Sequence, residues 1–167
     1  MGIFRIIADD FKWIKEKEDD PNDLCLHGHV VVQIGEERLE DYGTVSATAL
    51  YLLKSLERNH IKGEEIQMIP CCGHTMFADG NGQCIIMGCS NGTDWTILHD
   101  GDNIRLILEN GKETIVSLSE YKEEVYKFAD KIEDYYKACQ PKIIPENEPD
   151  RSGYIAFWNE WHERRTK

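Results

Sequence analysis

Cysteines and histidines are the residues of this chain best suited to chemistry, and several of them lie close together in the sequence. Zinc is usually held by four nitrogen or sulfur ligands on two short segments, so Cys71, His74, Cys84 and Cys89 form a candidate site. The spacing Cys71-x2-His74 suits one such segment. Cys84 and Cys89 suit the other less well, because residues five apart on a strand point to opposite faces. The alternative is that these cysteines, with Cys72, are small apolar core residues.

A cysteine nucleophile with a histidine base is a second possible chemistry, since a nearby base activates a thiol. The candidate nucleophiles and bases are Cys25, Cys71, Cys72, His27, His74 and His99. No local nucleophile signature surrounds these cysteines, and the sequence has no phosphate-binding glycine loop, His-Glu-x-x-His or Gly-x-Ser-x-Gly motif. We therefore expect a protein without catalytic activity or cofactor, with a zinc- or cysteine-dependent enzyme built on Cys71–Cys89 as the alternative.

Acidic residues dominate the charge of the chain: 31 Asp and Glu face 19 Lys and Arg, for a formal net charge of −12. Nucleic acids and anionic membranes attract basic surfaces, so we expect neither as a partner. The first 43 residues contain eleven acids and five bases, which is half of the net charge. Asp100-Gly101-Asp102 resembles a calcium loop only superficially, because later ligands are missing, and we interpret it as a turn.

Regularly spaced turn signals predict antiparallel strands. The segments Gly80–Gly82, Asn91-Gly92, Asp100-Gly101 and Asn110-Gly111 separate runs in which apolar residues alternate with polar ones. Alternation of this kind indicates a sheet with one buried and one solvated face. We expect a mostly antiparallel β-meander of about five to seven strands.

Two long helices and a short aromatic one should cover this sheet. Apolar residues at helical spacing predict helices over Thr44–Asn59 and Ser119–Ala138, and Ser117-x-x-Glu120 fits a capping box for the second. The prolines of 141–150 indicate an exposed linker to a terminal helix over 153–165. Together these elements predict an α+β fold in one domain, 1–167.

The composition also favours a cytosolic protein. No apolar run reaches the roughly 18 residues that a membrane helix needs. The apolar start of the chain is interrupted too early, by Asp9-Asp10, to be the core of a signal peptide. We therefore expect a cytosolic chain whose cysteines are free thiols.

The meander around Trp95–Asp102, the helix that follows and the ending Tyr154–Trp161 resemble small acidic immunity proteins of bacterial polymorphic toxin systems, including contact-dependent growth inhibition. The resemblance implies a protein that binds a cognate, basic toxin domain, often a nuclease, and blocks it; the free protein would be a monomer. The expected contacts are acidic residues and terminal aromatics: Asp94, Asp100, Asp102, Glu146, Glu148, Trp158 and Trp161. The two tryptophans could instead dock on the core.

Overall fold

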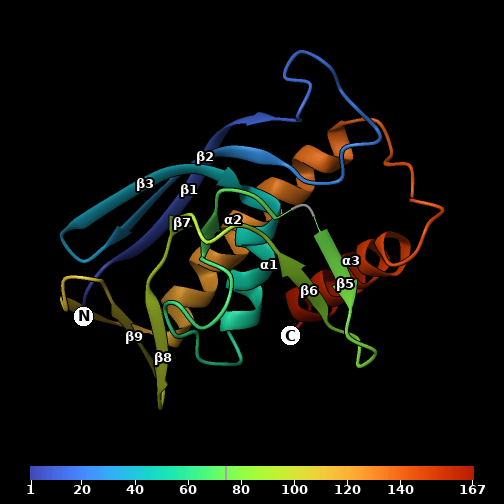
Figure 1. Ribbon diagram of the computed structural model, residues 1–167. Helices are drawn as coiled ribbons and strands as arrows, with labels where there is room; N and C mark the ends of the chain where they lie inside the picture. The colour runs from blue at the N-terminus through green and yellow to red at the C-terminus, as the bar shows by residue number, and fades with distance from the viewer. Residues whose placement is uncertain (74) are drawn as a thin grey trace.

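The computed structural model describes residues 1–73 and 75–167, so the candidate ligand His74 lies outside the described residues. The predicted α+β class is confirmed, with three helices and antiparallel strands in the described part (Figure 1). The elements are β1 (Phe4–Lys12), β2 (His27–Ile34), β3 (Glu37–Thr44), α1 (Val45–Ser55), β4 (Ile69–Pro70), β5 (Thr75–Ala78), β6 (Cys84–Met87), β7 (Gly92–Thr93), β8 (Thr96–Asp100), β9 (Asn103–Ile107), β10 (Glu113–Ser117), α2 (Leu118–Ala138) and α3 (Asp150–Arg165).

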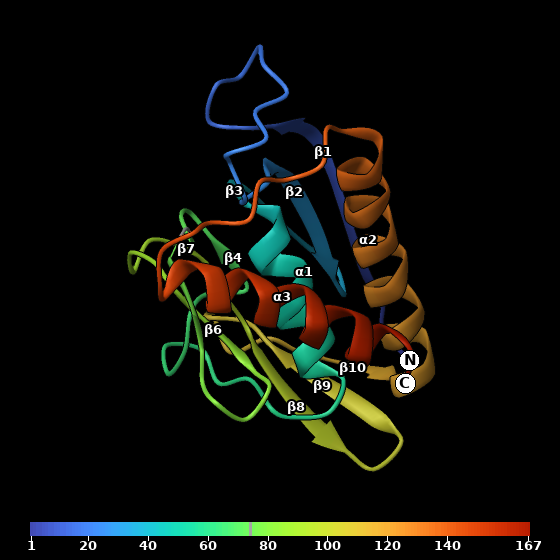
Figure 2. The ribbon, with the colours of Figure 1, turned by 90° about the vertical axis from the view of Figure 1, so that its right-hand side faces the viewer.

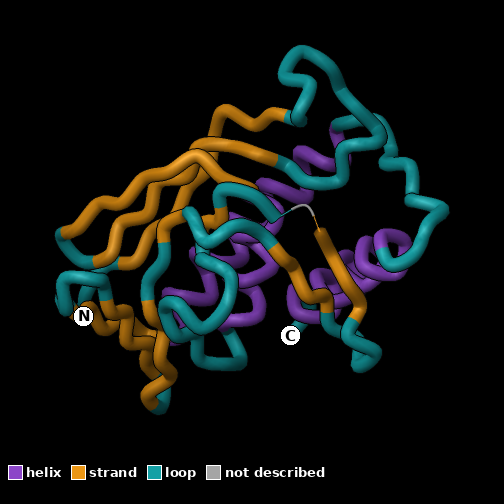
Figure 3. Tube along the Cα trace, in the orientation of Figure 1, coloured by secondary structure: helices purple, strands orange, loops and turns teal. Residues whose placement is uncertain are grey.

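The strands form several small sheets and not the single meander that we expected. β1-β2-β3 and β10-β9-β8 are three-stranded sheets, and β4-β7 and β5-β6 are two-stranded pairs (Figure 3). Short segments cause the division, because β4 and β7 pair over only two residues each. Pro70 in β4 has no N–H to extend the pairing.

Three of the four predicted turns join consecutive strands. Gly101 and Gly111 have positive φ of 59° and 79° in the β8–β9 and β9–β10 turns, as these hairpins require. The turn around Asp79–Gln83 joins β5 to β6. Asn91-Gly92 is different: Gly92 pairs with Pro70 within β7, so the prediction of a hairpin there is wrong.

Helix α1 is the central element. It is shorter than the predicted Thr44–Asn59, and all of its residues from Val45 to Ser55 are buried. It contacts both α2 and α3, and Figure 2 shows α3 crossing in front of it. A helix that is buried on all sides belongs in the interior of the core.

Helix α2 is amphipathic and begins as predicted. The Ser117 side chain accepts the Glu120 N–H, and the Glu120 carboxylate accepts the Ser117 N–H, which completes the capping box. The buried stripe of α2 consists of Tyr121, Val125, Phe128, Ala129, Ile132 and Tyr136. This stripe faces α1 and β1.

The segment between α2 and α3 is mostly exposed, as predicted for a linker, but its beginning is fixed to the body. The Lys142 ammonium donates a hydrogen bond to the Asp20 carbonyl (2.7 Å) and lies 3.2 Å from the centre of the Trp13 ring. The Ile143 N–H donates to the Pro21 carbonyl (2.9 Å). Helix α3 then packs on β5, β6 and α1. None of the helices in residues 1–73 and 75–167 is long and apolar enough to cross a bilayer.

Candidate functional site

The sheet β1-β2-β3 has one face packed against the helices and one face open. Its inner side chains, such as Ile6, Val30 and Val32, are buried against α1 and α2. In the described part of the chain, no helix covers the opposite side, which forms the outer rim of the molecule (Figure 1). Strand pairing arranges the outer side chains in three rows across the strands: Asp9–His29–Tyr42, Ile7–Val31–Glu40 and Arg5–Gln33–Arg38. We call these nine residues the open face.

Two large side chains stand out on this open face. Ile7 is 57% exposed and Tyr42 is 51% exposed. Exposed aromatic and aliphatic side chains on a rigid strand are typical anchors of protein interfaces. Ile7 and Tyr42 are in adjacent rows and belong to the two outer strands, so together they extend over the width of the sheet.

Tyr42 is held in place by its neighbours. Its hydroxyl donates to the Asp10 carboxylate (2.6 Å), and this bond raises the pKa of the phenol. The His29 ring lies 5.0 Å from the Tyr42 ring, tilted by 35°. Asp10 lies within the register shift between Asp9 and Lys12 in β1 and has a φ of +50°, a conformation that aspartate tolerates better than most residues. The irregular backbone thus directs the Asp10 carboxylate at the tyrosine.

His29 connects the acidic side chains of the open face. Its Nδ1 lies 3.0 Å from an Asp9 carboxylate oxygen, and its Nε2 lies 3.7 Å from a Glu40 oxygen. Glu40 also pairs with Arg38 at 2.8 Å. The His29 ring therefore lies between two carboxylates from the strands on either side of β2.

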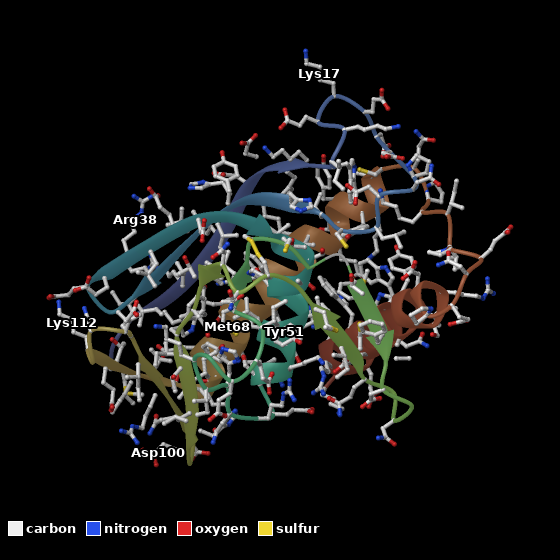
Figure 4. All side chains as sticks on the ribbon, in the orientation of Figure 1. Lys17, Arg38, Tyr51, Met68, Asp100 and Lys112 are labelled. Atoms are coloured by element: carbon white, nitrogen blue, oxygen red, sulfur yellow. A yellow bond between two sulfur atoms is a disulfide. The ribbon has the colours of Figure 1, made fainter. Side chains whose placement is uncertain are left out.

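The acidic excess lies beside the open face, because the nine residues of the face contain two carboxylates, Asp9 and Glu40, and two arginines, Arg5 and Arg38. Residues 1–43 span this sheet and the loop 13–23, and they account for −6 of the net −12. In Figure 4, Lys17 marks the tip of the loop and Arg38 the β3 edge of the open face. The apolar anchors are thus next to the most acidic part of the chain.

Four of the predicted partner contacts are exposed but belong to two distant regions. Asp100 and Asp102 flank the β8–β9 turn, and Figure 4 shows Asp100 at the bottom of the molecule. Glu146 and Glu148 lie in the segment before α3, at the right of Figure 1. The structure does not bring these two pairs together in one patch.

The prediction that Asp94 contacts a partner is wrong, because its side chain is only 4% exposed and fully engaged within the protein. One carboxylate oxygen pairs with His60 Nε2 (2.7 Å) and accepts the Met68 N–H (3.1 Å). The other accepts the Gly63 N–H (3.2 Å). Asp94 thereby fixes the loop between α1 and β4.

Of the two tryptophans of α3, Trp161 lies in the core and Trp158 is partly exposed. Trp161 is fully buried, so its assignment as a partner contact is wrong and the docking alternative holds. Trp158 is half-buried and packs edge-on against Tyr136 at 4.9 Å. It lines an open groove of about 330 Å³ with Ile144 and His162. Trp158 therefore stays available at a second apolar surface.

A cleft of about 710 Å³ lies between β3, β7 and the β9–β10 turn. Leu39, Thr93 and Asp94 line it, and the Asp94 carboxylate is used within the protein as described. Gln67 also lines it, and its buried side-chain oxygen has no hydrogen-bond partner among the described residues. The other charged lining residues are used in ion pairs: Lys62 pairs with Glu109 (2.9 Å), and Glu37 pairs with Lys112.

The predicted zinc set is not assembled as proposed. Cys84 is fully buried in β6, and burial raises the pKa of its thiol from 9.0 to about 12. Strand β6 ends at Met87, so Cys89 does not share a strand with Cys84 as we expected. Cys89 instead forms a disulfide with Cys71, and the expectation that all cysteines are free thiols is wrong for this pair.

Cys25, a predicted nucleophile, and His99, a predicted base, also have other neighbours. Cys25 is buried, donates to the Gly73 carbonyl (3.5 Å), and has a pKa raised from 9.0 to about 12, chiefly by burial. A thiol with such a pKa is a poor nucleophile at neutral pH. His99 Nε2 lies 2.9 Å from the Ser55 carbonyl at the end of α1.

Sequence reasoning missed the open face itself. Its signal was the alternation of Arg38, Glu40 and Tyr42 along β3, and of Arg5, Ile7 and Asp9 along β1. An apolar Ile7 in the outward phase of a strand conflicts with a purely solvated face. The proximity of Ile7 on β1 to Tyr42 on β3 depends on how both strands pair with β2, and the sequence alone does not show this pairing.

Comparison of the chain with protein-family models, curated proteins and solved structures finds no match. A function for this chain is therefore inferred from the geometry of the open face.

Proposed function

We propose that this protein is a cytosolic immunity protein that binds one cognate bacterial toxin domain and blocks it by occupying its active site or substrate surface. The observation that supports this proposal best is the open face, where exposed Ile7 and Tyr42 lie among carboxylates next to the most acidic part of the chain. Binding needs no cofactor, and the free protein is a monomer.

Electrostatics favours a basic partner. A net charge of −12 attracts a basic domain and accelerates its association, whereas it repels nucleic acid. Toxins that cleave nucleic acids need basic substrate surfaces, so carboxylates such as Asp9 and Glu40 could occupy positions that phosphates would take. A nuclease domain is therefore the partner that we expect.

The anchors should supply most of the affinity. Tyrosine in a desolvated interface often contributes 2 kcal/mol or more, which corresponds to about 30-fold in Kd. Tyr42 is already oriented by Asp10 and His29, so little side-chain entropy is lost when it binds. Rigid strands on a packed core preserve this geometry.

The test is co-purification and calorimetry with the domain encoded by the adjoining upstream gene. We expect a one-to-one complex whose Kd rises at least about 30-fold with Tyr42→Ala and about 10-fold with Ile7→Ala. Ile143→Ala is the matched control, because Ile143 is 55% exposed and lies in the segment before α3. This control should bind like the wild type.

Two results would contradict the proposal. The first is the absence of any complex with a neighbouring toxin domain. The second is a complex that tolerates Tyr42→Ala and Ile7→Ala together, which would place the contact elsewhere. Trp158→Ala tests the second apolar surface: unchanged affinity supports the open face, and a large loss assigns the interface to the groove beside α3.

A further inference from the structure

Three cysteines converge in the connection between β4 and β7. The sulfur atoms of Cys71, Cys72 and Cys89 all lie within 4.8 Å of one another. Cys71 and Cys72 are half-buried and Cys89 is exposed, so an ion from solvent can reach the group. Cys84, the ligand expected from sequence, is not a member, and Cys72 takes its place.

The backbone holds the two segments together independently of the sulfur atoms. Pro70 pairs with Gly92 in the β4–β7 ladder, and the Cys71 N–H donates to the Asn91 carbonyl (3.1 Å). Gly88 lies so close to the Cys72 carbonyl that any Cβ there would overlap its oxygen. The sulfur atoms are therefore brought together by a preformed scaffold.

One sulfur atom already accepts a hydrogen bond of the kind that stabilises a bound thiolate. The Cys89 N–H donates to the Cys72 sulfur (3.1 Å). Hydrogen bonds to ligand sulfurs stabilise their negative charge and orient them toward a metal. Cys72 is a free thiol, and no role in the disulfide explains its position.

We propose that Cys71, Cys72 and Cys89 in their reduced form bind one Zn²⁺ as three thiolates, with the fourth position open to water. Zinc prefers tetrahedral sulfur and nitrogen ligands, and soft thiolates select it over hard cations. The site joins the two segments that follow β4 and precede β7, and it contains no residue of the open face. In the reduced protein the zinc ion would link the residues after β4 to Cys89 before β7, as the Cys71–Cys89 disulfide links them in the oxidised protein.

Reduction followed by zinc binding converts the disulfide form into the zinc-bound form. A dithiol reductant, such as a thioredoxin-type protein, gives two electrons and two protons to the Cys71–Cys89 disulfide and becomes a disulfide itself. Zn²⁺ then replaces one proton on each of the three thiols, so three protons are released. Zinc binding should therefore weaken as the pH falls.

The test uses the full chain, reduced with a phosphine and kept free of oxygen. Zn²⁺ is titrated against a chromogenic chelator, and Co²⁺ is added separately to record thiolate-to-metal charge transfer. We expect one zinc per chain and a charge-transfer band in the wild type. Cys72→Ser should weaken zinc at least ~100-fold and reduce the band, because one ligand is lost.

Two further variants make the result decisive. Cys139→Ser is the matched control, since Cys139 is also a half-buried free cysteine but lies outside the cluster; it should bind zinc like the wild type. Cys89→Ser changes an exposed position and should also lose tight binding, which separates ligand loss from misfolding. Failure of reduced wild type to bind one zinc, or unchanged affinity in Cys72→Ser, would overturn the proposal. Neither result decides whether the open face binds a toxin, which the Tyr42→Ala and Ile7→Ala variants test separately.

Discussion

Glu160 of α3 is the centre of a buried ionic network that joins three elements, and its removal should destabilise the fold strongly. The carboxylate is 2% exposed and accepts hydrogen bonds from the Cys84 N–H (2.6 Å) and Arg164 Nε (2.8 Å). It lies 3.5 Å from the Lys54 ammonium, which also donates to the Cys84 carbonyl (2.7 Å). Burial lowers the pKa of Lys54, and the charge of Glu160 opposes this shift.

The magnitude follows from what each change leaves unpaired. Removing one partner of a buried ion pair costs about 3–5 kcal/mol. In Glu160→Gln the amide oxygen can still accept the Cys84 N–H, and Arg164 keeps its pair with Glu57 (2.7 Å), so we expect about 3 kcal/mol. Lys54→Met should cost about 2 kcal/mol, because Glu160 retains Arg164 while the Cys84 carbonyl loses its donor.

The double variant Lys54→Met/Glu160→Gln separates this pair from general damage to the core. With neither charge left, its cost should be at least about 1 kcal/mol less than the sum of the single costs. Urea unfolding followed by tryptophan fluorescence gives each free energy of unfolding, since Trp95 and Trp161 are fully buried. Additive costs, or a Glu160→Gln variant within about 0.5 kcal/mol of the wild type, would refute the reasoning.

Three further changes test other parts of the fold. Ser117→Ala removes the α2 cap and should lower the free energy of unfolding by about 1 kcal/mol, measured in urea. Gly153→Ala places a Cβ against the Met76 carbonyl and should cost about 1–3 kcal/mol, seen as a lower Tm. Cys25 and Cys84 stay protonated in the folded state up to about pH 12, whereas unfolded thiols ionise near 9.0. Each should therefore reduce stability by about 1.4 kcal/mol per pH unit as the pH rises across that range, and the double alanine variant should show a shallower pH dependence.

Local features were predictable because their causes lie within a few residues. The Ser117 cap, the α2 stripe and the turns at Gly101 and Gly111 depend on neighbours in sequence, and the structure confirms them. The α+β class follows from the same periodicities. Helix α1 was predicted too long because an apolar pattern does not state where burial ends.

Long-range contacts explain what the sequence could not show. Asp94 looks like an exposed acid in a loop, yet its three partners all come from the segment 60–68. Trp161 could be a surface anchor or a core residue at the same helical spacing, and only docking of α3 decides between them. Cys72 gave no separate signal, because its proximity to Cys89 depends on the pairing of β4 with β7.

The cluster of Cys71, Cys72 and Cys89 lies next to the end of β3, where it would help to fix the strand that carries Tyr42. Gly43 follows Tyr42, and a Cβ at Gly43 would overlap the Pro70 carbonyl immediately before Cys71. The Thr93 hydroxyl donates to the Asp41 carboxylate (2.9 Å), so β7 also contacts β3. A disulfide or a zinc ion that fixes β4 to β7 would thus support the strand that presents Tyr42. The disulfide and the zinc ion would join the same two segments. Either link would therefore keep the open face preorganised for binding.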